Sequence, residues 1–192
     1  MRVRNYALLG VLLFATASYA KPPSDEALAK VALPKEQLNA MLADAVFRDR
    51  ATPVSAFVLG IEPMCKLYAA AADKSVARHL PQWRKNLLRA FRDIVPPQAL
   101  EQAVGEGTIG RNRLGQYMNQ IGAVMEQSSG ALLKQSTADV LQEIASATAT
   151  VKIGDIDQDA RNRELRAHVA KTGKLCGVVN AANSSVKLES LN

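Results

Sequence analysis

Hydrophobic residues recur with the period of an α-helix along most of the chain. The first clear face follows Pro34 and consists of Leu38, Met41, Leu42, Ala45 and Val46, at i, i+3, i+4, i+7 and i+8. The strict alternation of apolar and polar residues that marks a half-buried strand is nearly absent. The pattern therefore predicts an all-α fold, in which about six to eight helices form one compact domain.

The clearest helix is predicted to begin at Pro81 and to end before Pro96. Its apolar side consists of Trp83, Leu87, Leu88, Phe91 and Ile94. Upstream, Thr52 followed by Pro53 has the form of a helix cap and a first-turn proline. Residues 54–61 fit either a short strand or a buried helix, and the helix is favoured.

Four more helical segments are predicted in the second half. A short helix is expected from Gln98 to Val104, and a longer one after Thr108 has the apolar seam Leu114, Met118, Ile121 and Met125. We expect Ser128–Gly130 to interrupt that helix and Ser136, with Asp139 three residues on, to start the next. The last helix follows Asp155, Asp157 and Asp159 and is expected to end at Gly173.

Proline and glycine divide the chain into two halves. All eight prolines lie at or before Pro97, and every glycine after residue 60 lies at or beyond Gly105. This change places a possible pivot near residues 96–107. We expect a signal peptide over 1–20, a helical domain over 21–183 and a flexible tail over 184–192.

The first 20 residues have the features of an export signal. Arg2 and Arg4 precede the short apolar run from Tyr6 to Ala15, and a small-residue cleavage pattern ends at Ala20. The run of about ten residues is too short to span a membrane, which takes ~20. We expect cleavage after Ala20 and a periplasmic or secreted protein, with an uncleaved anchor as the alternative.

Export changes the interpretation of the two cysteines, Cys65 and Cys176. An even number of cysteines in an oxidising compartment favours a disulfide. We predict that these two are joined and staple the domain, and the alternative is a pair of buried free thiols. A bridge between the Pro-containing and Gly-containing halves favours one domain over two.

Positive charge is moderate once the signal is set aside. Removal of Arg2 and Arg4 lowers the net charge from +6 to +4. The candidate partner-binding basic residues are Lys85, Arg89 and Arg92 on one predicted helix face, and the pairs Arg111, Arg113 and Arg161, Arg163. They could instead form ordinary solvated faces, because acidic residues are interleaved with them. Few aromatic residues and an extracytoplasmic location argue against nucleic acid.

Candidate catalytic and metal chemistry is sparse. The Asp155, Asp157 and Asp159 run lacks the Gly and Glu that a calcium loop needs, so helix capping is the better interpretation. The two histidines, His79 and His168, have no metal-ligand spacing, and no phosphate-binding glycine loop is present. We expect no metal, no cofactor and no catalytic residue. Trp83 and the methionine seam are interpreted as core rather than as a ligand-binding surface.

Three functional hypotheses remain at this point. The leading one is an exported, non-catalytic helical protein that acts by protein–protein contact, as an adaptor, inhibitor or immunity-type protein. Its expected partner is another envelope or exported protein with an acidic surface, with anionic lipid or lipopolysaccharide as a weaker possibility. The second is a carrier of a small ligand or lipid between helices. The third is a small cell-wall lytic enzyme, because several glutamates are available.

Overall fold

The computed structural model describes residues 22–176, so the predicted signal peptide (1–20) and tail (184–192) lie outside the described residues. The described chain is all-α and contains no strand. Its helices are α1 (Asp25–Ala32), α2 (Pro34–Arg48), α3 (Ala51–Leu59), α4 (Ile61–Ile94), α5 (Pro97–Glu106), α6 (Thr108–Arg113), α7 (Met118–Thr148) and α8 (Gln158–Thr172), with short 3₁₀ turns at Leu114–Tyr117 and Ile153–Asp155.

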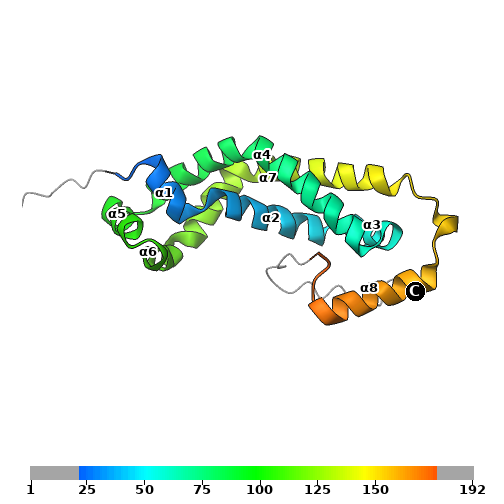
Figure 1. Ribbon diagram of the computed structural model, residues 1–192. Helices are drawn as coiled ribbons and strands as arrows, with labels where there is room; N and C mark the ends of the chain where they lie inside the picture. The colour runs from blue at the N-terminus through cyan, green and yellow to red at the C-terminus, as the bar shows by residue number, and fades with distance from the viewer. Residues whose placement is uncertain (1–21, 177–192) are drawn as a thin grey trace, which may run out of the picture.

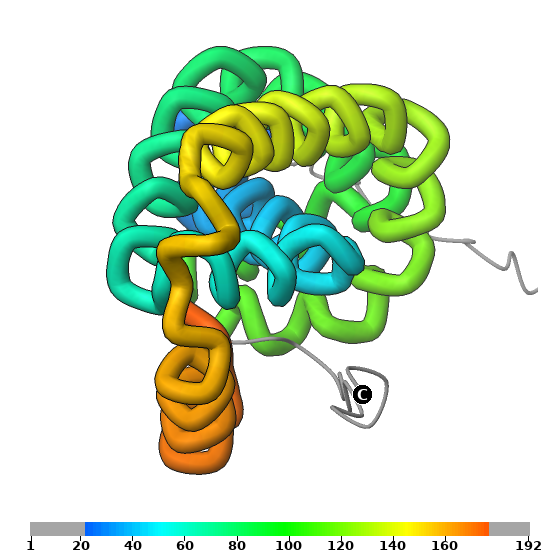
Figure 2. The backbone as a smooth tube through the Cα atoms, turned by 90° about the vertical axis from the view of Figure 1, so that its right-hand side faces the viewer, coloured from blue at the N-terminus to red at the C-terminus, as the bar shows by residue number. Residues whose placement is uncertain are grey.

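Two long helices, α4 and α7, run antiparallel along the molecule and form its main packing contact (Figure 1). The α2 helix packs on both of them, and α1, α5 and α6 gather at one end. The α8 helix lies at the other end and projects away from the remaining helices in the end-on view (Figure 2). The molecule therefore has a helical body, α1–α7, with α8 attached as an arm.

The core lies between α2, α4 and α7. Trp83 and Phe91 are its largest fully buried side chains, and they come from the same face of α4. In α2, Leu38, Leu42 and Val46 are buried as the sequence predicts. Met41, which belongs to the same predicted face, is 43% exposed and lies outside the core.

The helix predicted to begin at Pro81 begins twenty residues earlier, at Ile61, and passes through Pro81 without a break. A proline inside a helix removes one hydrogen bond, to the carbonyl four residues before it, here that of Ala77. Both Ala77 and Pro81 are exposed, so water can reach that carbonyl. Burial of Val76 and Trp83 on the opposite side of α4 keeps the helix continuous across this position.

The interruption predicted at Ser128–Gly130 and the restart predicted at Ser136 are also absent, because α7 is one helix of 31 residues. Two of the serines that suggested boundaries contact α4 instead, Ser129 through its hydroxyl and Ser136 through its backbone carbonyl. The Ser136 hydroxyl itself is buried without a partner among residues 22–176. Asn86 Nδ2 donates to Ser129 Oγ at 2.9 Å, and Ser75 Oγ donates to the Ser136 carbonyl at 3.1 Å. In the seam predicted upstream, Leu114, Ile121 and Met125 are buried, whereas Met118 is 38% exposed.

Residues 54–61, for which the sequence allowed a strand but favoured a helix, are mostly helical and form most of α3. The predicted cap at Thr52 is wrong, because Thr52 lies inside α3 and its Oγ1 donates to the Val46 carbonyl at 2.5 Å. The side chain that bonds to the backbone at the start of α3 is instead that of Asp49, whose Oδ1 accepts from Ala51 N at 2.8 Å. The expected short helix after Pro96 is confirmed as α5.

The last predicted helix is confirmed as α8. The carboxylate of Asp157 accepts from Ala160 N at 2.9 Å, which confirms helix capping as the role of the acidic run. Gly173 ends the helix in the left-handed conformation, with φ of 65°. Unlike the helices of the body, α8 contains no buried residue.

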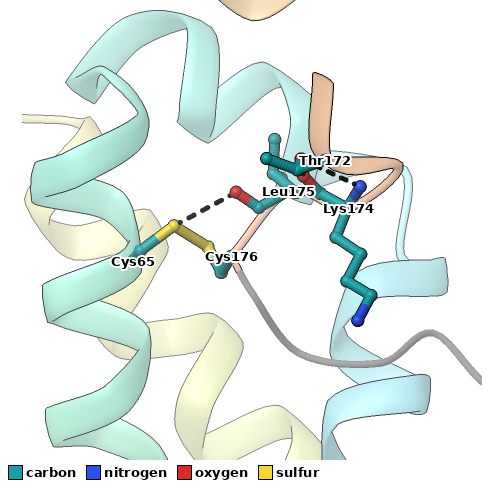
Figure 3. The surroundings of a disulfide bond; sticks show 5 residues. All are labelled: Cys65, Thr172, Lys174, Leu175 and Cys176. Atoms are coloured by element: carbon teal, nitrogen blue, oxygen red, sulfur yellow. Dashed lines mark hydrogen bonds between the residues drawn. A yellow bond between two sulfur atoms is a disulfide. The ribbon is translucent and has the colours of Figure 1, made fainter. Parts of the chain in front are cut away.

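The predicted disulfide is confirmed: Cys65 in the second turn of α4 is joined to Cys176 just beyond α8 (Figure 3). Their Cα atoms are 5.2 Å apart and the bridge spans 111 residues of sequence. The Sγ of Cys65 lies 3.4 Å from the Leu175 carbonyl oxygen. A disulfide sulfur carries no proton, so this is a close polar contact rather than a donated hydrogen bond.

Candidate functional site

The arm α8 presents one face to the body and one face away from it. The inner face consists of Arg161, Leu165, His168 and Val169, which recur at i, i+4, i+7 and i+8 and are all half-buried. The contacts of this face are with α3 and with the start of α4. Because none of the four is fully buried, the apolar contribution of this contact is small compared with that of the core.

Arg161 attaches the beginning of α8 to the body at the α3–α4 junction. Gly60 connects those two helices with φ of 90°, a conformation that side chains rarely adopt. A Cβ at Gly60 would lie 2.5 Å from the Arg161 guanidinium, so the glycine also provides the space that this side chain occupies. Arg161 in turn donates to Glu164 Oε2 at 2.7 Å. Arg161 is thus a positioning residue and not a free cation.

A surface groove of about 540 Å³ lies between α8 and the start of α4. Its lining is Ile61, Glu62, Cys65, Lys66, Ala69, Glu164, His168, Leu175 and Cys176. The disulfide therefore forms part of the groove wall. The volume is within the range of small-molecule sites, but the groove opens broadly to solvent, unlike the enclosed cavity that a carrier needs.

Two carboxylates, Glu62 and Glu164, line this groove from opposite helices, which is the outline of a glycosidase site. Such a site needs one carboxyl whose pKa is raised so that it can act as the acid. The ammonium of Lys66, 2.6 Å from Glu62 Oε1, instead lowers the pKa of Glu62 below its usual value. Glu164 is held by Arg161. The pair is therefore arranged as two ion pairs and does not fit acid–base cleavage.

The outer face of α8 carries three exposed cations, Arg163, Arg166 and Lys171. Their spacing along the helix places them on the side opposite Leu165. None of them forms an ion pair with another residue in the range 22–176. Ala167 and Ala170 lie between them, and the exposed Asp159 lies one turn before Arg163, so the surface is mainly cationic and free of large apolar side chains.

The remaining predicted basic residues are divided between structural contacts and open surface. Arg92 contacts Asp25 and donates to the Pro23 carbonyl at 3.3 Å, which fastens α1 to α4. Arg111 donates to the carbonyls of Val31 and Lys30, at 3.1 and 3.2 Å, and so satisfies the C-terminal end of α1.

Arg113 pairs with Glu106 at 3.1 Å across the α5–α6 turn. Lys85 and Arg89 are exposed on α4, and within the described chain neither forms an ion pair. The seven predicted residues therefore do not form one face. Sequence reasoning missed Arg166 and Lys171, although their helical spacing from Arg163 was a usable signal.

A second groove, of about 380 Å³, follows the α4–α7 interface and is lined by charged and polar groups. At its edge Asp139 accepts from Arg78 at 2.7 Å and lies 3.2 Å from His79 Nε2. Ser75, one turn before His79, donates to a backbone carbonyl rather than to the imidazole. The Ser–His–Asp composition is therefore not a nucleophilic triad, and these residues join the two helices.

No group of three or more possible metal-ligating side chains gathers anywhere in residues 22–176. None of the described helices combines the length and apolar character needed to cross a membrane. Comparison of the chain with family models, with curated proteins and with solved structures finds no match. The outer face of α8, with three exposed cations on one helix, is the candidate functional site.

Proposed function

We propose that this chain is an exported, non-catalytic helical protein that acts by contact with an acidic surface of another envelope or exported protein. The contact is made by the outer face of α8, defined by Arg163, Arg166 and Lys171. The observation that carries the proposal is the grouping of three exposed cations on one face of α8, a helix that contains no buried residue. Of the predicted basic residues, Arg92, Arg111, Arg113 and Arg161 bond within the fold, and Lys85 and Arg89 are two exposed cations on α4. Within residues 22–176 the three cations of α8 form no ion pair, so they are available to a partner.

The side chains between the cations favour a protein partner over a lipid surface. A helix that lies in a membrane interface buries a face of large apolar residues between the headgroups. The outer face of α8 has only Ala167 and Ala170 between its cations. The larger apolar residues of α8, Leu165 and Val169, are on the inner face and contact the body. Charge complementarity with carboxylates is the recognition that this surface offers.

We expect reversal of charge on the outer face to abolish partner recovery. The variant is Arg163→Glu/Arg166→Glu/Lys171→Glu, purified with its disulfide intact and tested by affinity purification from its envelope fraction. The three cations would attract the carboxylates of the partner during association and pair with them in the complex. We therefore expect the recovered amount of an acidic protein to fall at least tenfold. Recovery by the unchanged protein should fall as salt is raised.

Two matched variants make the result specific. Lys30→Glu/Lys35→Glu/Lys134→Glu changes the net charge equally at exposed positions on other helices and should leave recovery unchanged. Lys85→Glu/Arg89→Glu tests the α4 surface by the same measurement. Loss of recovery in either matched variant, with α8 reversal harmless, would contradict the assignment to α8. Reversal-sensitive binding to anionic phospholipid vesicles, without an acidic protein, would replace the protein partner by a lipid surface.

A further inference from the structure

The geometry points to a redox latch: we propose that reduction of the Cys65–Cys176 disulfide releases α8 from the body while α1–α7 stays folded. The disulfide then has a local role, holding the arm, in addition to cross-linking the chain. Release does not depend on the identity of a partner. Its consequence for binding rests on the proposed function, because only a latched α8 presents Arg163, Arg166 and Lys171 in a fixed position on the body.

The attachments of α8 are a half-buried inner face, whose Leu165 packs against the core cluster, and one contact near each end. At its beginning, Arg161 lies against Gly60 at the α3–α4 junction. Beyond its end, Cys176 is bonded to Cys65 of α4. Between these points the groove separates α8 from α4, and no residue of the helix is buried. Covalent attachment is therefore the strongest of the contacts that keep the arm in place.

Without the bridge, α8 has little to keep it helical. An isolated helix of up to about 15 residues is marginal in water, and α8 has 15. The preceding connection, residues 149–157, contributes no buried residue, so it tethers the arm without fixing its direction. By contrast, the body keeps its own buried cluster, which includes Trp83, Phe91 and Ile144 and receives no fully buried member from α8.

The disulfide is placed where an exchanging thiol can reach it. Cys65 and Cys176 are both partly exposed, and both line the open groove. In the reaction a thiolate of an external dithiol attacks one sulfur, the protein S–S bond breaks, and the other cysteine leaves as a thiolate. The second thiol of the reagent then displaces the first cysteine. The dithiol is oxidised to its disulfide by two electrons, and the protein gains two thiols.

Reduction also uncovers apolar surface. Ile61 and Ala69 on α4 form the side of the groove that remains with the body, and Leu175 leaves with the arm. The reduced Cys65 remains on α4 and lines the open groove, where it stays accessible to an external disulfide. The latch closes again by the reverse exchange, in which an external disulfide accepts the two electrons and is reduced to its dithiol while Cys65 and Cys176 re-form their bond.

Hydrogen exchange measured by mass spectrometry tests the latch directly. The samples are the oxidised chain, the chain reduced by dithiothreitol, and Cys65→Ala/Cys176→Ala with and without that reagent. We expect α8 amides to exchange at least tenfold faster after reduction, and equally fast in the double variant. Because the chain has no other cysteine, the reagent should change nothing in the double variant. Amides in the middle of α4 and α7 should keep their protection throughout.

Two results would overturn the proposal. In one, α4 and α7 lose protection together with α8, which would make the disulfide a staple of the whole domain. In the other, α8 keeps its protection after complete reduction, which would show that non-covalent contacts suffice. Neither measurement involves a partner, so failure of the latch is distinguishable from failure of the proposed contact.

Discussion

Trp83→Ala is expected to lower the free energy of unfolding by about 3–5 kcal/mol, the usual cost of removing a large aromatic side chain from a core. Trp83 is 1% exposed and lies on the α4 face that packs into the core with Leu87 and Phe91. Its removal would leave a cavity in the core that the surrounding helices can fill only by moving together. Urea unfolding followed by far-ultraviolet circular dichroism should give a lower midpoint at an unchanged slope.

A second variant at Trp83 identifies which part of the side chain accounts for the lost stability, and a variant at an exposed position serves as the control. The indole Nε1 of Trp83 is buried and makes no hydrogen bond to any residue in the range 22–176. Trp83→Phe removes that donor and keeps most of the ring, so its cost should be well below that of alanine. Met41→Ala, at an exposed position of α2, should change stability by no more than about 0.5 kcal/mol. A Trp83→Ala cost near that of Met41→Ala would contradict the core assignment.

Gly110→Ala is expected to destabilise the protein by about 1–3 kcal/mol because it overpacks the α5–α6 contact. A Cβ at Gly110 would lie 2.4 Å from both the Cα and the carbonyl oxygen of Ala103. Both atoms belong to the backbone of α5, so a side-chain rotation cannot relieve the clash. The two helices would have to separate, and with them Leu100 and Ala103 would leave the core.

Gly105→Ala is the matched control, with the opposite expected sign. Gly105 lies inside α5, and no atom is within 4 Å of the position that a Cβ would take. Alanine there should stabilise the helix by about 0.5–1 kcal/mol, since it costs less conformational entropy than glycine. Thermal unfolding of both variants measures the two changes in stability. Equal effects of the two substitutions would contradict the close α5–α6 approach.

Helical periodicity predicted the fold class and much of the core. Leu38, Leu42, Val46, Trp83 and Phe91 are buried as the pattern requires, since the spacing of apolar residues within one helix reports the side that faces the core. The prediction of Cys65–Cys176 pairing rested on the expected compartment and on cysteine number, and it is confirmed in the fold.

Helix boundaries were less predictable where a polar residue serves a distant helix. Ser129 and Ser136 suggested breaks in α7, yet each bonds to α4, and a local pattern contains no information about that neighbour. The same reason applies to Arg111, which completes the end of α1 from some 80 residues away. Whether a surface arginine is structural or available to a partner depends on such tertiary contacts.

The outer face of α8 could be predicted from the sequence only in part. Once Asp157 is known to cap the helix, the spacing of Arg163, Arg166 and Lys171 places them together. Their separation from the body depends on the disulfide and on Arg161 at Gly60, which set the direction of the arm. Neither feature can be derived from helical spacing.

Photo-crosslinking from the outer face of α8, in cells that produce the protein, tests whether this face contacts an acidic partner. A photoreactive residue replaces Ala167, between the three cations, or Ala138, an exposed alanine on α7 that serves as the matched control. A contact through the outer face of α8 predicts a discrete adduct with an acidic protein from position 167, lost on reversal of Arg163, Arg166 and Lys171, and none from position 138. No adduct from position 167, or the same adduct from both positions, would contradict it.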